Sequence, residues 1–218
     1  MKNINEIILF LIILLLSVLL NTVGAKHLIS KKKLEEKDIK TKAEKIIFTV
    51  LSVAFTGVTT AFLIYKEKSI PMLVILCMIA ILAGMIFLMD IRVRIIPNVC
   101  LYPILLLAVI RYIVLKNYVG IGSGFVAMFF ACYGLLLLTK LLGFNGCFGS
   151  GDIKLLSVCV FFFGIDRNII GFVVGWVISL FATTIVLLLM KKITMKSFIA
   201  YGPYISIGIL TGLCFMYI

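Results

Sequence analysis

The sequence has few charged residues, and this scarcity sets its class. Only 14% of its 218 residues are charged, whereas 63% are apolar, and the mean hydropathy is +1.26. A soluble domain carries about 25% charged residues, so the composition excludes an ordinary soluble globular protein. Lipid is the solvent for most of this chain, and we expect an all-α, polytopic membrane bundle.

Residues that catalyse reactions or bind metals are equally scarce. His27 is the single histidine and lies in a basic stretch, which argues against catalysis by a Ser-His or Cys-His pair. The six cysteines form no C-x-x-C pair, so neither a zinc site nor a disulfide framework is indicated. The sequence therefore predicts a function that needs no metal and no organic cofactor.

Acidic residues are outnumbered by basic ones, with 9 Asp and Glu against 21 Lys and Arg. Eight of the lysines lie in residues 26–45, directly after an apolar stretch. A basic segment beside a membrane helix typically faces anionic lipid or fixes topology. We therefore expect the lipid bilayer as a partner, and no nucleic acid.

Apolar runs follow one another along the chain. A hydrocarbon core of about 30 Å needs about 20 apolar helical residues to cross it. The first run is longer than the apolar region of a signal peptide, so we expect a retained helix. Gly171 with Gly175, and Gly208 with Gly212, form faces of small residues that predict close helix packing. The eight expected transmembrane segments are residues 7–23, 46–65, 72–89, 99–115, 118–142, 155–165, 169–190 and 198–218.

The distribution of Lys and Arg predicts the orientation of these segments. With residues 26–45 in the cytoplasm, alternation places fifteen of the 21 basic residues on that side. Residues 155–165 are too few for an ordinary span, and we expect a short helix whose preceding loop, residues 143–152, dips below the membrane surface. The expected location is the cell (inner) membrane, crossed several times.

Asp90 and Asp152 stand out among the nine acidic residues. Five of the others lie in the first 44 positions, and Glu67 and Asp166 fall in short turns that the topology places outside. Asp90 closes the third segment and Asp152 opens the sixth, so both lie at the cytoplasmic face and at a similar depth. Neighbouring basic residues could simply pair with them, yet ionisable residues at such a boundary usually indicate function.

Two carboxyl groups that share a water molecule have the chemistry of an aspartyl protease. They cannot both ionise easily when they lie close together, so the pair holds one proton. The ionised member takes a proton from the attacking water, and the protonated member donates toward the carbonyl oxygen and then the leaving amine. Glycines before Asp152 suit a backbone that turns sharply beside a bound peptide. We predict that Asp90 and Asp152 are the catalytic residues.

Three stretches of the chain form a more specific pattern. Residues 90–98 read Asp-Ile-Arg-Val-Arg-Ile-Ile-Pro-Asn, residues 149–155 read Gly-Ser-Gly-Asp-Ile-Lys-Leu, and residues 201–204 read Tyr-Gly-Pro-Tyr. Their order and spacing resemble those of the prepilin peptidase (type IV leader peptidase) family, which includes archaeal preflagellin peptidases. The first resembles the family's first aspartate with its I-P-N element, the second its G-x-G-D-x-K-L element, and the third a late G-P turn. The residues that support these motifs are Pro97, Asn98, Gly149, Gly151 and Lys154.

The resemblance implies a membrane aspartyl protease of G-x-G-D architecture with Asp90 and Asp152 as its catalytic pair. It also implies a prepilin-like substrate (a prepilin, pseudopilin or preflagellin) with a basic leader ahead of a hydrophobic helix, cleaved at the cytoplasmic face. Longer bacterial members carry a cytoplasmic insert with paired C-x-x-C elements and methylate the new N-terminus. This chain lacks those cysteines, so it resembles the short, peptidase-only members, and we expect no N-methylation.

The resemblance covers roughly residues 72–218 and suggests two parts. We expect N-terminal transmembrane helices and a Lys-rich cytoplasmic loop in residues 1–65, and a catalytic membrane domain in residues 66–218. Two alternatives stay open. One is an intramembrane protease similar to presenilin or signal peptide peptidase, which also uses G-x-G-D, and the other is a small cation- or proton-coupled transporter.

Overall fold

The computed structural model of the chain describes residues 4–24, 27, 42–141, 149–164, 168–189 and 201–218. Within these ranges the chain forms eight α-helices, a short π-helical segment η1 and no β-strand.

Each α-helix overlaps one of the eight expected segments, which confirms the all-helical prediction. The elements are α1 (Ile4–Leu19), η1 (Leu20–Gly24), α3 (Lys42–Lys66), α4 (Ile70–Val93), α5 (Asn98–Val114), α6 (Tyr118–Leu141), α7 (Ser150–Phe163), α8 (Asn168–Leu189) and α9 (Gly202–Phe215).

Length and apolar composition identify the helices that can cross a membrane. Within the described ranges, three helices are both long enough and apolar enough to cross a membrane, namely Glu44–Lys66, Ile70–Val93 and Tyr118–Leu137. The other apolar stretches are shorter, and α7 with 14 residues is about 21 Å long at 1.5 Å per residue. The chain is a multi-pass membrane protein that combines long spans with short helices.

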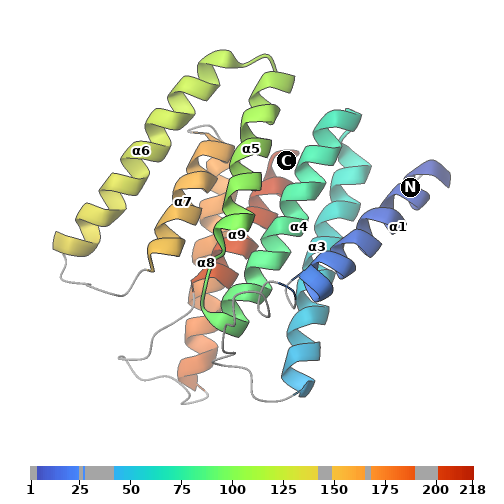
Figure 1. Cartoon of the computed structure of the whole chain (residues 1–218), viewed down its shortest axis with the longest axis horizontal. Coiled ribbons are helices and arrows are strands. Elements are labelled where there is room, and N and C mark those ends of the chain that lie inside the picture. Colours follow the sequence, from blue (N-terminus) through green and yellow to red (C-terminus); the bar gives the residue numbers. More distant parts are fainter. Residues whose placement is uncertain (1–3, 25–26, 28–41, 142–148, 165–167, 190–200) are drawn as a thin grey trace.

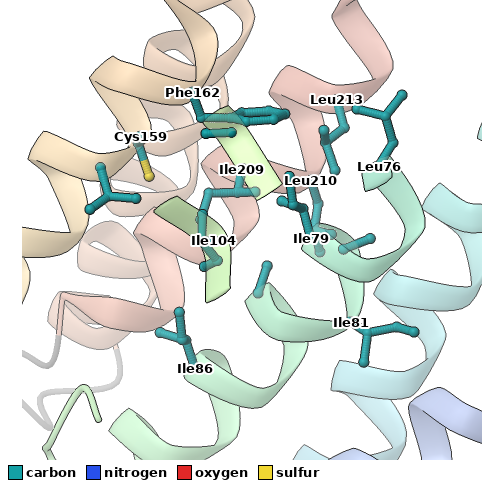
Figure 2. Close-up of a cluster of buried hydrophobic side chains, with 14 of the residues drawn as sticks. Leu76, Ile79, Ile81, Ile86, Ile104, Cys159, Phe162, Ile209, Leu210 and Leu213 are labelled. Carbon is teal, nitrogen blue, oxygen red and sulfur yellow. The ribbon is translucent and has the colours of Figure 1, made fainter. Parts of the chain in front are cut away.

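Helix α4 lies at the centre of the bundle. It packs against α3, α5 and α9, and its buried residues lie on all sides of the helix. Such a helix is apolar around its whole circumference, as expected for a span enclosed by other helices. Figure 2 shows the core where α4, α5, α7 and α9 meet, with Ile79 and Ile86 of α4 facing Ile104 of α5 and Ile209 of α9.

Helices α8 and α9 approach each other closely through glycines. A Cβ atom on Gly208 would lie 2.9 Å from the carbonyl oxygen of Phe172, and one on Gly171 would overlap the Phe215 side chain. Small residues allow helices to pack by direct van der Waals contact in lipid, where the hydrophobic effect gives no driving force. The close packing predicted from these glycine faces is confirmed.

Successive helices run in opposite directions, so the bundle has two distinct ends (Figure 1). The aspartate end is the one where α4 finishes and where α5, α7 and α9 begin. The opposite end holds the turn between α3 and α4 and the C-terminus of α9. There the Tyr217 hydroxyl donates a hydrogen bond to the carboxylate of Glu67, which also accepts one from the Ser69 N–H.

Candidate active site

Asp90 lies in the last turns of α4 and is only 4% exposed. Its Oδ2 atom accepts a hydrogen bond of 2.9 Å from the backbone N–H of Gly202, the first residue of α9. The first N–H groups of a helix have no partner within the helix and carry partial positive charge, so they stabilise a nearby carboxylate. The start of α9 therefore holds the Asp90 side chain.

Glycine is the residue that makes this contact possible. A Cβ atom at position 202 would lie 2.7 Å from both the Cβ and the Oδ2 of Asp90, closer than real Cβ atoms come. Pro203 follows in the first turn of α9, where its missing N–H costs nothing. The Gly202-Pro203 pair therefore positions Asp90. The sequence analysis noted this pair only as part of a motif that resembles the family, and a Gly-Pro pair before an apolar run is the feature that marks the start of α9.

Asp152 lies in the first turn of α7 and is 9% exposed. Its Oδ2 accepts a hydrogen bond of 3.0 Å from the N–H of Gly149, and its own N–H donates to the Gly149 carbonyl over 3.0 Å. This reciprocal pair satisfies two groups at the helix start and resembles a capping box. Gly149 is therefore the N-cap of α7, and Asp152 helps to define where α7 begins.

The structure corrects one expectation about this region. Residues 143–152 were expected to form a loop, but α7 begins at Ser150, so Gly151 and Asp152 are helical. The reason is that Gly149 caps the helix, so α7 begins before the apolar run that starts at Leu155. Residues 143–148 of the expected loop lie outside the described residues.

The segment between α4 and α5 follows Asp90 in the chain and packs against the start of α7, the helix that carries Asp152. α4 ends at Val93, and the N–H of the C-cap residue Arg94 donates to the Asp90 carbonyl over 2.8 Å. Ile96 follows and is buried, and Pro97 is the N-cap of α5, which begins at Asn98. A Cβ atom on Gly151 would lie 3.2 Å from the Cβ of Ile96. The I-P-N element therefore starts α5 and supports the first turn of α7.

The structure brings Asp90 and Asp152 to the same end of the bundle and buries both side chains. Among the described residues, no Cα atom of α4 comes within 8 Å of a Cα atom of α7. The two backbones are therefore separate, and each carboxylate has a glycine N–H as a donor. Chemistry that uses both groups must take place in the space between α4 and α7.

A groove of about 360 Å³ lies between α5, α6 and α7, and its lining includes Lys154, two positions after Asp152 in α7. Its walls are mainly apolar, and the polar side chains of Asn98, Lys154 and Ser157 lie along it. In Figure 1, α6 starts beside α5 and diverges from it toward the aspartate end. Lys154 is exposed and lines this groove, so two of the motif residues, Asn98 and Lys154, face a surface that can bind a ligand.

The other end of α7 is also anchored by side chains. Arg111 and Tyr112 of α5 donate hydrogen bonds to the carbonyl oxygens of Phe162 and Phe161, in the last turn of α7. The Arg111 guanidinium also lies 4.9 Å from the centre of the Phe162 ring. These carbonyl groups have no partner within the helix, and a cation near a helix C-terminus is stabilising. No sequence motif includes Arg111, and this anchoring role is visible only in the fold.

A membrane-embedded helical bundle with two buried aspartates at one end has the features of a membrane aspartyl protease. Comparison with protein families supports this class, since a model of the type IV leader peptidase family matches residues 75–194. The chain therefore belongs to this family and is an aspartic-type prepilin peptidase. The matched region includes Asp90 and Asp152. No curated protein and no solved structure matches the chain.

Membership of this family confirms the resemblance seen in the sequence, and it implies prepilin-like substrates. It also decides against the two alternatives, the presenilin-like protease and the small transporter. The Tyr-Gly-Pro-Tyr stretch at residues 201–204 lies beyond the matched region. Its place in the site comes from the hydrogen bond between Gly202 and Asp90.

Proposed function

We propose that Asp90 and Asp152 are the catalytic pair of this peptidase. The observation that carries the proposal is the burial of both carboxyl groups at one end of the bundle, with a glycine N–H bound to each. Burial keeps the groups poorly hydrated, and backbone donors fix their positions without requiring a second charged side chain. The motif residues support the pair in two ways. The starts of α5 and α7 are formed by Pro97, Asn98, Gly149 and Gly151, and the groove is lined by Asn98 and Lys154.

In the proposed mechanism the two aspartates share one proton. The ionised carboxylate removes a proton from a water molecule as that water attacks the scissile carbonyl carbon, and the protonated carboxyl group donates to the carbonyl oxygen. The tetrahedral intermediate then collapses, and the leaving amine takes a proton from the carboxyl group that accepted it from water. Two acids are sufficient for this cycle, so the mechanism uses no metal and no organic cofactor.

The groove between α5, α6 and α7 supports a substrate with a hydrophobic helix. It is lined by Leu101 and Leu105 from α5, Met128 and Cys132 from α6 and Val158 from α7. In this proposal the apolar segment of the substrate lies in the groove, and its polar leader extends past Lys154 toward Asp152. We propose that the substrate is a prepilin, pseudopilin or preflagellin whose basic leader precedes this segment.

The basic residues support a cytoplasmic location for the site. The aspartate end carries Lys45, Arg92, Arg94, Lys140 and Lys154. The opposite end carries Lys66, Lys68, Arg111 and Lys116. Cytoplasmic segments of membrane proteins carry an excess of Lys and Arg. Residues 28–41 and 190–200, which contain many of the remaining lysines, lie outside the described residues. We therefore propose cleavage at the cytoplasmic face of the cell membrane.

We further propose that the chain is a peptidase-only member of its family and does not methylate its product. The cysteine pattern supports this, because the chain contains no C-x-x-C element. In the proposed division, residues 66–218 form the catalytic domain, and residues 1–65 form the N-terminal helices and the Lys-rich loop. The relation to archaeal preflagellin peptidases belongs to the same proposal.

Co-expression with a candidate prepilin tests the catalytic assignment. Asp90→Asn and Asp152→Asn should each abolish the gel shift that accompanies removal of the leader, while the amount of protein in the membrane stays unchanged. Asp166→Asn is the matched control, because this acid is followed directly by Arg167 in the sequence and lies in none of the three motifs. Normal cleavage by either of the first two variants would rule out the two-carboxylate mechanism.

A further inference from the structure

Arg92 is a buried cation that the proposed peptidase chemistry does not use. It lies in the last turn of α4 and is 6% exposed. One of its nitrogen atoms, Nη2, donates a hydrogen bond of 2.9 Å to the hydroxyl oxygen of Thr49 on α3. Its Nε atom is also buried and has no hydrogen-bond partner among the described residues.

A buried guanidinium group needs an anion to offset the loss of hydration. A neutral hydroxyl accepts one hydrogen bond but supplies no negative charge. Asp90 lies only two positions away on the same helix, and side chains at that spacing do not face each other. The Asp90 carboxylate accepts a hydrogen bond from α9, whereas Arg92 is bound to α3. Arg92 therefore faces a different part of the bundle.

Arg92 lines a pocket of about 370 Å³ at the aspartate end of α3 and α4. Lys45 provides a second cation, Thr22 and Thr49 provide hydroxyl groups, and the described lining includes no acidic residue. The two hydroxyl groups already donate hydrogen bonds to the carbonyl oxygens of Val18 and Lys45, so the groups left to bind an anion are the two cations. Arginine binds the oxygen atoms of a phosphate group through several N–H groups at once, and the buried Nε of Arg92 is one such donor. The remaining lining residues are Val23, Ile46 and Val50.

An apolar groove continues directly from this pocket. It has a volume of about 540 Å³, lies between α1 and α3, and shares Thr49 and Val50 with the pocket that Arg92 lines. Along α3 the groove extends from Thr49 to Ala61, a distance of about 18 Å at 1.5 Å per residue. Small residues at positions 54, 57 and 61 leave room for an extended apolar chain.

We propose that these two adjoining spaces form a binding site for an anionic phospholipid. The phosphate of the head group binds Arg92 and Lys45, and an acyl chain lies along the groove between α1 and α3. Basic pockets between membrane helices are suited to lipid head groups. A free phosphate ion fits the polar pocket alone, whereas the continuous apolar groove favours the lipid. The proposal does not depend on the catalytic assignment of Asp90 and Asp152.

Native mass spectrometry of the purified full-length chain tests this site. Phosphatidylglycerol should remain bound to the wild type more strongly than phosphatidylcholine, and Arg92→Gln should lower the retention of phosphatidylglycerol by about tenfold, since a charge-assisted hydrogen bond is lost. Arg94→Gln is the matched control, because Arg94 is exposed and does not line the pocket. Asp152→Asn should bind the lipid normally, which separates this test from the test of catalysis.

Two further arms keep the test decisive. If Arg92→Gln does not fold, Lys45→Gln should show the same selective loss, because Lys45 is only half-buried at the pocket edge. Ala54→Phe fills the apolar groove and should also release the lipid, whereas Val126→Phe on the exposed face of α6 should not. Equal retention of both lipids, or equal retention by the Arg92 and Arg94 variants, overturns the proposal. Inorganic phosphate could also stabilise the protein against heat as much as phosphatidylglycerol does, with no effect of Ala54→Phe. This result would assign the pocket to free phosphate and would also overturn the lipid proposal.

Discussion

The carboxylate of Asp90 accepts a hydrogen bond of 2.9 Å from the backbone N–H of Gly202, a residue 112 positions later in the chain. The bond joins the end of the central helix α4 to the first turn of α9. Because the donor belongs to the backbone, the position of Asp90 depends on where α9 begins and on the absence of a side chain at position 202. This contact makes Gly202 a positioning residue for the proposed catalytic pair.

Gly202→Ala should lower the cleavage rate strongly, by about 100-fold if Asp90 moves by about 1 Å. The added Cβ atom would lie 2.7 Å from Oδ2 of Asp90, so the carboxylate or the start of α9 must move. Gly134→Ala is the matched control, since a Cβ atom there meets nothing within 4 Å. Initial rates of prepilin cleavage in proteoliposomes measure both effects. Equal rates for the two variants would show that the contact does not position Asp90.

Gly151→Val should impair both stability and cleavage more than Ser150→Ala. Even the first carbon of the new side chain would lie 3.2 Å from the Cβ of Ile96, and overpacking of this kind costs about 1–3 kcal/mol. Ser150 is exposed and tolerates the loss of its hydroxyl group. Replacing Ile96 with Ala in the Gly151→Val variant should restore part of the activity. If the double variant is no better than Gly151→Val, crowding against Ile96 is not the cause.

Cys132→Trp should raise the KM for a prepilin substrate and change kcat little. Cys132 lines the groove between α5, α6 and α7, so a larger side chain there competes with the apolar segment of the substrate. Tyr133→Trp is the control, because the adjacent Tyr133 is 58% exposed and does not line the groove. Steady-state cleavage assays with both variants give the comparison. An unchanged KM in Cys132→Trp would remove this groove from the proposed substrate path.

Cysteine labelling tests the proposed orientation. In a variant without the natural cysteines, Asn98→Cys and Ser150→Cys should react with a membrane-impermeant reagent only from the cytoplasmic side. Lys68→Cys and Asn117→Cys should react only from the outside, because these exposed positions lie at the opposite end of the bundle. Labelling of position 150 from outside alone would reverse the orientation derived from the basic residues.

Mass spectrometry of a processed pilin tests the proposed absence of methylation. The pilin is produced in cells in which this chain is the sole prepilin peptidase, and its mass should equal that of the cleaved peptide. The expectation follows from the missing C-x-x-C elements, which accompany methylation in the longer members that this chain otherwise resembles. A product heavier by one methyl group, present only when this chain is expressed, would contradict the prediction.

Local features of the sequence predicted the architecture well. Each of the eight expected segments overlaps a helix of the described residues, because long apolar runs in lipid can satisfy their backbone groups only by forming helices. α7 begins five residues before the expected segment, because the expectation was based on hydrophobicity and the apolar residues begin only at Leu155. The cap formed by Gly149 and Asp152 decides where the helix begins.

The sequence by itself determined that this is a membrane protein and singled out Asp90 and Asp152, because acids are rare in a chain that is 63% apolar. Only the tertiary structure decided what holds each acid and what surrounds it. The donor to Asp90 comes from α9, the support of Gly151 comes from Ile96, and the burial of Arg92 depends on α3. Each of these contacts joins residues that are far apart in the chain. Such contacts arise from the way the helices pack, which the pattern of residues within any single helix does not specify.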